Sequence, residues 1–309
     1  GTIAMKKFEY VSYVDVNLPT GKGQSTVYAN SWDDERVGDA AQVTIIFVVT
    51  NRNYEQVILT EKEIKECVFL GDYHTGEIFQ PTTAVYWDRW AVDVDSVVVN
   101  TQAAVNAGVV YQSITYNLRS RGYHTISHTC AAVLTPDGGE SIVTSCKGTQ
   151  FDSGITVTPL PAIWYDYSDL DYTRVDTQNK TVGNYVVDQD NYYVSIPNGT
   201  ISDSSSSSGN ADIFVKAKAD VNPPIYQIVF KVGAEGTYNL KLDNGDIIPL
   251  PYNQRYGQLC LTRVSIENCT VSSPFSDEIK VTAYDPYQNV AYLAFSPKDN
   301  NNTISMSNA

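Results

Sequence analysis

An acidic and aromatic stretch, Trp164-Tyr-Asp-Tyr-Ser-Asp-Leu-Asp-Tyr172, has the most unusual local composition in the chain. Its carboxylates Asp166, Asp169 and Asp171 are oxygen donors of the kind that Ca²⁺ prefers, although the spacing of an EF-hand loop is not met. Trp164 and the tyrosines could instead form a platform on which a sugar stacks, with the carboxylates binding its hydroxyl groups. The third interpretation is a solvated acidic loop with tyrosines packed beneath it. The sequence alone leaves these three interpretations open.

Cysteine spacing suggests a β-hairpin. Cys130 and Cys146 are equally distant from Gly138, and apolar-rich runs lie on either side of that glycine. Antiparallel pairing across a turn at Gly138 would place the two cysteines opposite each other, where Cα atoms lie about 4.5 Å apart, within reach of a disulfide. We therefore predict a Cys130–Cys146 disulfide and an oxidising compartment.

The three other cysteines are less regular. Cys260 and Cys269 flank an eight-residue segment and could close a second, smaller disulfide loop. Cys67 is then left over. We expect it to be a buried free thiol, with an intermolecular disulfide as the alternative.

No catalytic constellation emerges from the remaining residues. His124 and His128 would share a strand face, but residues four apart in a strand lie about 13 Å apart, too far to ligate one ion. The sequence contains no GxSxG, HExxH or P-loop motif. A glycosidase needs only two carboxylates, and nothing singles out a pair. We expect a protein that is not an enzyme and that uses no cofactor, apart from the Ca²⁺ that the acidic stretch allows.

The charge of the chain restricts its partners. Its 309 residues carry a net charge of −14, of which −12 falls in the first 210 residues. Nucleic acids and anionic membrane surfaces need a basic footprint, so neither is expected as the main partner. No apolar run approaches the roughly 18 residues of a membrane span, and we expect no membrane insertion. Four Asn-x-Ser/Thr sequons are compatible with a glycoprotein, but about as many are expected by chance; they begin at Asn179, Asn198, Asn268 and Asn301.

Strand signals dominate the elements that must position these residues. Tyrosine, valine and threonine are abundant, and runs such as Gln42–Thr50 and Ile279–Tyr284 are typical of strands. Helical signal is confined to about Glu61–Leu70, where Thr60 and Glu63 have capping-box spacing, and to Gln102–Ala107. The predicted fold is all-β with two β-sandwich domains.

The predicted domain boundary follows from one low-complexity segment. Residues 202–210 contain five consecutive serines and are expected to form a linker or loop. Residues 211–309 contain six or seven short, evenly spaced strand candidates, which is typical of an immunoglobulin-like sandwich. Residues 19–201 are expected to form a larger sandwich, jelly-roll or immunoglobulin-like, with a short helical insertion.

The functional hypothesis is based on the N-terminal residues 1–18, which are predicted to contain a strand. Phe8, Tyr10, Val14 and Val16 alternate onto one face of a predicted strand, and Pro19–Gly23 follows as a flexible joint. This segment is either an ordinary first strand or a strand donated to the sheet of a neighbouring subunit. Contacts of the second kind do not close and generate filaments.

In this architecture the chain resembles the secreted β-sandwich subunits of prokaryotic and archaeal surface filaments, such as strand-donating pilins and thread or tube proteins. The resemblance is in the Phe8–Val16 strand, the Pro19–Gly23 joint and the two β domains, so it carries over no site residue. It implies an extracellular or cell-surface structural subunit that assembles with itself by strand complementation. The alternatives are a secreted carbohydrate-binding or adhesin module, with glycans as partners, and a viral capsid or fibre component.

Overall fold

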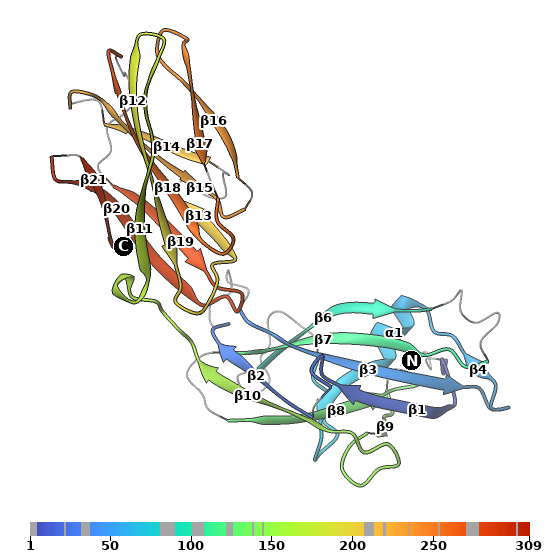
Figure 1. Ribbon diagram of the computed structural model, residues 1–309. Helices are drawn as coiled ribbons and strands as arrows, with labels where there is room; N and C mark the ends of the chain where they lie inside the picture. The colour runs from blue at the N-terminus through green and yellow to red at the C-terminus, as the bar shows by residue number, and fades with distance from the viewer. Residues whose placement is uncertain are drawn as a thin grey trace. The chain divides into compact units, whose positions relative to one another are not determined.

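The computed structural model describes residues 5–21, 23–31, 38–80, 90–100, 108–121, 126–137, 139–143, 145–206, 213–218, 221–233, 235–252, 254–269, 278–300 and 302–309 (Figure 1). Nearly all regular structure in these residues is β, and the predicted all-β sandwich fold is confirmed. The chain divides into two compact units, Gly1–Ala162 and Ile163–Ala309. No described helix has both the length and the apolar character needed to cross a bilayer.

Unit 1 is a sandwich of two five-stranded sheets. The first has the order β1-β3-β7-β6, with β4 paired to β3, and the second has the order β2-β10-β8-β5, with β9 paired to β8. The strands of the first sheet are β1 (Tyr10–Asn17), β3 (Ala41–Thr50), β4 (Gln56–Val57), β6 (Trp90–Val98) and β7 (Gln112–Ser120). Those of the second are β2 (Gln24–Ala29), β5 (Val68–Asp72), β8 (His128–Leu134), β9 (Ile142–Val143) and β10 (Ile155–Pro161).

The core of unit 1 lies between these sheets. In β3 the alternating residues Val43, Ile45 and Phe47 are fully buried, as expected where one face of an antiparallel sheet packs inward. They join Leu70 of β5 and Leu134 of β8 in one hydrophobic cluster. Alternation along the sequence therefore determines which face of each sheet meets the core.

One short helix, α1 (Glu61–Cys67), connects the sheets. The Thr60 hydroxyl accepts a hydrogen bond from the Glu63 N–H at 3.1 Å, and the Glu63 carboxylate accepts one from the Thr60 N–H at 3.0 Å. The predicted capping box is confirmed. Cys67 ends the helix as a buried free thiol, and burial raises its pKa to about 11. The other predicted helix, Gln102–Ala107, lies outside the described residues.

The N-terminal strand β1 completes the sheet of its own chain. It forms one edge of the first sheet and pairs antiparallel with β3, from Tyr10 opposite Thr50 to Asn17 opposite Thr44. Phe8, Val14 and Val16 are buried in the core of unit 1, but Tyr10 is 39% exposed. A β-bulge between Val11 and Tyr13 shifts the ladder by one residue, so the predicted common face of Tyr10 and Val14 is wrong.

Unit 2 has three layers. A central sheet of order β11-β12-β18-β15-β14 packs against the sheet β13-β19-β20-β21 on one face and against the hairpin β16-β17 on the other. The central strands are β11 (Asp171–Val182), β12 (Tyr185–Ser195), β14 (Ile213–Lys218), β15 (Ile225–Phe230) and β18 (Leu259–Glu267). The outer strands are β13 (Asp203–Ser206), β16 (Gly236–Lys241), β17 (Ile247–Tyr252), β19 (Ile279–Tyr284), β20 (Val290–Lys298) and β21 (Thr303–Asn308).

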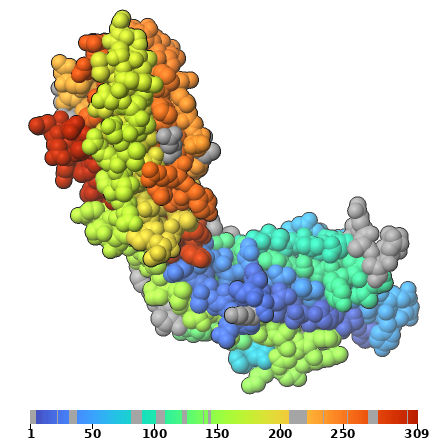
Figure 2. Space-filling view, viewed as in Figure 1, coloured from blue at the N-terminus to red at the C-terminus, as the bar shows by residue number. Residues whose placement is uncertain are grey.

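The division between the units differs from the predicted boundary at residues 202–210. Residues up to 201 were predicted to belong to the first sandwich, yet β11, β12 and β13 lie between Ile163 and Ser206 and belong to the sheets of unit 2. The β11–β12 hairpin is long, and its atoms run the length of this unit on the face shown in Figure 2. Unit 2 therefore begins before its acidic and aromatic segment.

The first part of the serine-rich segment is a strand, not a linker. Residues Asp203–Ser206 pair with β19. The Ser204 side chain is buried, and its hydroxyl accepts a hydrogen bond from the Val232 N–H at 3.0 Å. The Ser204 hydroxyl here gives a buried backbone N–H its hydrogen-bond acceptor. A serine-rich composition by itself does not reveal this structural role.

The Cys130–Cys146 disulfide is not formed, although the predicted register is found. Val133 pairs with Val143 and Leu134 with Ile142, the register that would place Cys146 opposite Cys130. However, β9 ends after two residues, and Ile155 of β10 occupies the position beside Cys130. The Cys130 thiol lies in the core between the sheets, whereas Cys146 packs in a separate cluster with Ala131 and Val133. Both are free thiols, and the turn residue Gly138 is outside the described residues.

The Cys260–Cys269 disulfide is excluded by strand geometry. Cys260 is near the start of β18, which stays extended to Glu267. At about 3.3 Å per residue that distance is roughly 23 Å, so the two residues that follow cannot return Cys269 to within the roughly 7 Å that a disulfide needs. Both cysteines are free. The cysteines therefore give no support to an oxidising compartment.

Candidate functional site

The acidic and aromatic segment is held against the first residues of β20. The Ile163 N–H donates to the Asn289 side-chain oxygen at 3.0 Å, and the Tyr165 N–H donates to the Val290 carbonyl at 2.9 Å. Trp164 thereby forms a parallel bridge with Val290. The segment acts as a short extra strand, and its side chains alternate in direction on either side of this contact.

A buried aspartate organises the turn on which this contact depends. Asp285 is 4% exposed, and its carboxylate accepts hydrogen bonds from the backbone N–H groups of Tyr287 and Asn289 at 2.8 and 2.9 Å. The Tyr165 hydroxyl donates to the same carboxylate at 2.7 Å. Such charge-assisted bonds are stronger than neutral ones, so Tyr165 is an anchor of the segment, and the ring beside it, Trp164, is left at the surface.

Asp166 joins the segment to the C-terminal strand. It caps the 3₁₀ turn η2 (Tyr167–Asp169), accepting hydrogen bonds from the hydroxyl group and the N–H of Ser168. The Asn308 amide donates to its other oxygen at 2.6 Å, and the Asn308 oxygen accepts from the Tyr167 N–H at 2.9 Å. The Ser168 hydroxyl first, and then Asn308 and the Ser168 N–H, hold the pKa of Asp166 below its usual value. Asp166 is therefore ionised at neutral pH.

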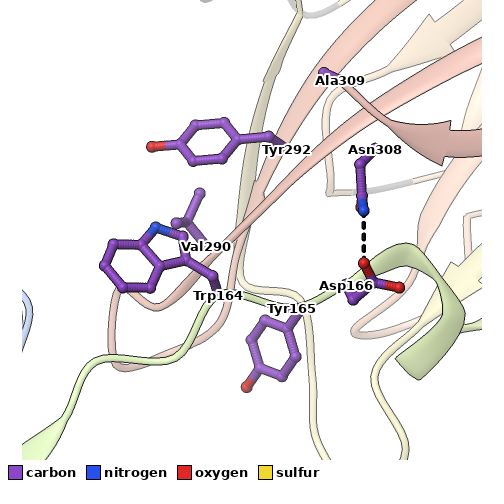
Figure 3. A pocket seen from close by; sticks show the side chains of 7 residues that line it. All are labelled: Trp164, Tyr165, Asp166, Val290, Tyr292, Asn308 and Ala309. Carbon is purple, nitrogen blue, oxygen red and sulfur yellow. Dashed lines mark hydrogen bonds between the residues drawn. The ribbon is translucent and has the colours of Figure 1, made fainter.

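These contacts shape a shallow groove of about 210 Å³ (Figure 3). Trp164 and Tyr292 are 44% and 47% exposed, and their rings extend to the same side of the strands with Val290 between them. Asp166 and Asn308 form the polar part of the lining. The groove is smaller than the roughly 300–1,000 Å³ of sites that enclose a drug-sized ligand, so it suits a ligand that lies on the surface.

The structure does not bring the three predicted calcium ligands together. Asp166 is turned toward Ser168 and Asn308, whereas Asp169 and Asp171 are exposed. Among the described residues, the one group of three carboxylates whose ligand atoms lie within 4.8 Å of one another is formed by other aspartates. The Ca²⁺ prediction for Asp166, Asp169 and Asp171 is therefore wrong, because the carboxylate oxygens of these three residues do not all lie within 4.8 Å of one another.

Two residues of the groove were missed in the sequence. Tyr292 and Asn308 lie on β20 and β21, far along the chain from Trp164. The signal for Tyr292 was an aromatic residue with a polar hydroxyl inside an otherwise apolar run, and it is exposed between the buried residues Ala291 and Leu293. For Asn308 the sequence carries no comparable signal.

Three of the four sequons begin in the described part of the chain, and the asparagine of each is exposed. Asn179 and Asn198 are exposed on β11 and after β12. Asn268 is also exposed, and its amide nitrogen donates to the Asn184 carbonyl at 3.2 Å. Asn301 lies outside the described residues. Glycan attachment at these positions stays a prediction.

The groove offers recognition chemistry. Two aromatic faces can cover apolar surface, and a carboxylate and an amide can bind hydroxyl groups. None of the seven residues that line it is a serine, cysteine, histidine or lysine, so the lining supplies no side chain of those nucleophilic types.

Comparison with known proteins adds little. No protein-family model matches the chain, and no curated protein matches it significantly. Among solved structures, the C-terminal domain of the Streptococcus pyogenes antigen I/II-family protein AspA is similar at 10% identity and a TM-score of 0.25, covering 90% of this chain and 96% of that one. A structure described as BspA_C_mut is similar at 8% identity and a TM-score of 0.20, covering 92% of this chain and 99% of that one. Scores of this size carry no argument, and the function has to be inferred from the groove itself.

Proposed function

We propose that this protein is a binding module of an extracellular or cell-surface location, and that the groove at Trp164 and Tyr292 holds a sugar residue of a glycan. The observation that carries the proposal is the pair of half-exposed rings flanking Val290, with Asp166 and Asn308 beside them. The role is binding without catalysis.

The recognition follows from the chemistry of a sugar ring. One face of a pyranose is largely apolar C–H surface, which the Trp164 or Tyr292 ring can cover, and its edge carries hydroxyl groups. The carboxylate of Asp166 and the amide of Asn308 both retain hydrogen-bonding capacity after bonding to each other. A ligand that is apolar on one face and rich in hydroxyl groups at its edge therefore matches the groove.

The groove is preorganised. Trp164, Asp166 and Asn308 are attached to backbone that is already tied to β20 and η2 by the hydrogen bonds described above. Little main-chain entropy is then lost when a ligand binds. Because the groove is shallow, we expect one site to bind weakly and several copies on a surface to bind by avidity.

The test is a glycan array probed with multivalent protein. We expect hits that are lost in Trp164→Ala and reduced in Tyr292→Ala. Tyr256→Ala is the matched control, because Tyr256 is 94% exposed in the same unit but does not line the groove. An array with no hits, or hits that all three variants retain, would contradict the proposal. Surface labelling of intact cells tests the location separately.

A second candidate is a structural subunit of an extracellular filament or surface layer that assembles by strand exchange. The observation that favours it is that β1 is an edge strand, connected to β2 by residues 18–23. A strand so placed could leave its own sheet and make the same contacts with β3 of a neighbouring subunit. Electron microscopy of the full chain tests this candidate: filaments would support it, closed particles would favour a capsid component, and monomers would exclude both.

A further inference from the structure

Three aspartates meet where the β11–β12 ladder is irregular. Asp176 pairs with Asp190, and the ladder then shifts by one residue between Asp176 and Gln178. Asp188 lies two residues from Asp190 and so projects from the same face of β12. The shift brings it close to Asp176 as well, because one carboxylate oxygen from each of the three residues lies within 4.8 Å of the others. β-Bulges commonly re-aim side chains in this way.

The most deeply buried of the three carboxylates, that of Asp190, has one oxygen that lacks a hydrogen-bond partner in the described part of the chain. The Asp190 side chain is fully buried, and its Oδ2 atom lies 3.0 Å from Nη2 of Arg174 and 3.7 Å from Nη1 of Arg263. Its Oδ1 atom has no hydrogen-bond partner among the described residues. A buried carboxylate oxygen without a partner costs free energy, so this atom is placed to take a ligand.

The charge of the cluster favours a cation. Three carboxylates and two guanidinium groups leave a net charge of −1, and both guanidinium groups approach the same oxygen of Asp190. The two arginines therefore do not fully balance the negative charges of the Asp176 and Asp188 carboxylates.

We propose that Asp176, Asp188 and Asp190 bind a Ca²⁺ ion, a site separate from the groove at Trp164. Oxygen ligands alone favour hard cations over zinc or copper. Ca²⁺ accepts six to eight oxygens at about 2.3–2.6 Å in a flexible geometry, whereas Mg²⁺ demands a near-ideal octahedron at about 2.0–2.1 Å, so an irregular group of three carboxylates with room for water suits Ca²⁺ better. Asp176 is exposed and Asp188 half-buried, which leaves an entry path and room for water ligands.

Such an ion would tie the edge strand β11 to the central sheet. Of the three ligands, Asp176 lies on β11 and the other two on β12. Asp190 in turn contacts Arg263 of β18. The ion would therefore link charged residues on three neighbouring strands, β11, β12 and β18. We therefore expect Ca²⁺ to stabilise unit 2 and not unit 1.

The direct test is a titration of the full chain with Tb³⁺, followed by displacement with Ca²⁺. Tyr192 lies two residues from Asp190 on the same face, about 7 Å along the strand, close enough to sensitise Tb³⁺ luminescence. We expect luminescence that Ca²⁺ removes, and an affinity for Ca²⁺ that falls at least tenfold in Asp176→Asn and in Asp188→Asn. Asp169→Asn is the matched control, an exposed aspartate of the same unit outside the cluster, and should bind as the unchanged chain does.

A thermal measurement guards against a folding artefact. Without added metal, Asp176→Asn should melt within about 2 °C of the unchanged chain, because Asp176 is exposed. With Ca²⁺ the melting temperature of unit 2 should rise in the unchanged chain and in Asp169→Asn, but not in Asp176→Asn. The proposal is overturned if millimolar Ca²⁺ produces neither displacement nor a thermal shift, or if Asp169→Asn loses the response as fully as Asp176→Asn. An equal response to Mg²⁺ would overturn the assignment to Ca²⁺.

Discussion

The N-terminal strand makes a sharp prediction, because the structure places it in the core of its own unit. Phe8 is 3% exposed and packs in the unit 1 core with Val14 and Val16. Replacing a buried phenylalanine by alanine costs about 3–5 kcal/mol. In a unit of 162 residues, each kcal/mol shifts the melting temperature by about 2–4 °C. Phe8→Ala should therefore lower the melting temperature of unit 1 by roughly 6–20 °C and leave unit 2 unchanged.

Tyr10→Ala is the matched control on the same strand. Tyr10 is 39% exposed and stacks on Tyr54 with ring centroids 5.0 Å apart, a contact worth roughly 0.5–1.5 kcal/mol. Its effect should be at most about half that of Phe8→Ala.

Removing residues 1–18 deletes Phe8, Val14, Val16 and Leu18 together, a loss of about 6–12 kcal/mol, which is comparable with the whole stability of a domain. That truncation should unfold unit 1.

The assay is differential scanning calorimetry of the full chain over a hundredfold range of protein concentration. If β1 pairs with its own β3, the melting temperature of unit 1 should not depend on concentration. If the strand is donated to a neighbour, the melting temperature should rise with concentration, because association then contributes to stability. A concentration-dependent transition would refute the pairing of β1 with its own β3 and favour the strand-exchange candidate. Equal effects of Phe8→Ala and Tyr10→Ala would instead contradict the burial of Phe8.

Three further predictions follow from single contacts. Asp166 has a lowered pKa, so the stability that its hydrogen bonds contribute should be fully present above the ordinary aspartate pKa of about 3.9 and be lost only as the pH falls through the lower pKa of the folded state; glycan binding should therefore persist at pH 5, and binding that is already lost at pH 5 would contradict this. Peptide mapping without reduction should find free thiols at Cys130, Cys146, Cys260 and Cys269, and a Cys130–Cys146 disulfide would show that the ladder continues beyond β9. Ser204→Ala should destabilise unit 2 by about 1–3 kcal/mol in urea unfolding, because it leaves the Val232 N–H without its acceptor, whereas an effect near zero would indicate that residues 203–206 are a loop after all.

Local patterns in the sequence were reliable where the structure depends on near neighbours. The capping box of Thr60 and Glu63 predicted where α1 begins, since both of its hydrogen bonds join residues three apart. Alternating burial predicted the strands Gln42–Thr50 and Ile279–Tyr284, the second with the bounds that the structure has. Trp164 and Asp166 were singled out by composition, and both line the groove.

Long-range pairing decided the rest. The polar residues Asp203–Ser206 form a strand because β19 supplies hydrogen-bonding partners, which no local propensity reveals. Cys130 and Cys146 have the register of a disulfide, but Ile155 of β10 competes successfully for the position beside Cys130.

The groove at Trp164 and the aspartate cluster show the same difference between what the sequence determines and what the tertiary structure adds. The sequence by itself determined an acidic all-β chain with a tryptophan beside carboxylates. Only the tertiary structure brought Tyr292 and Asn308 to that tryptophan and showed that it is exposed, because the hairpin of β20 and β21 lies more than 100 residues after Trp164 in the sequence. Likewise a one-residue shift in the β11–β12 ladder gathers Asp176, Asp188 and Asp190. Side-chain direction reverses at every residue of a strand, so a bulge that composition does not predict decides which carboxylates share a face.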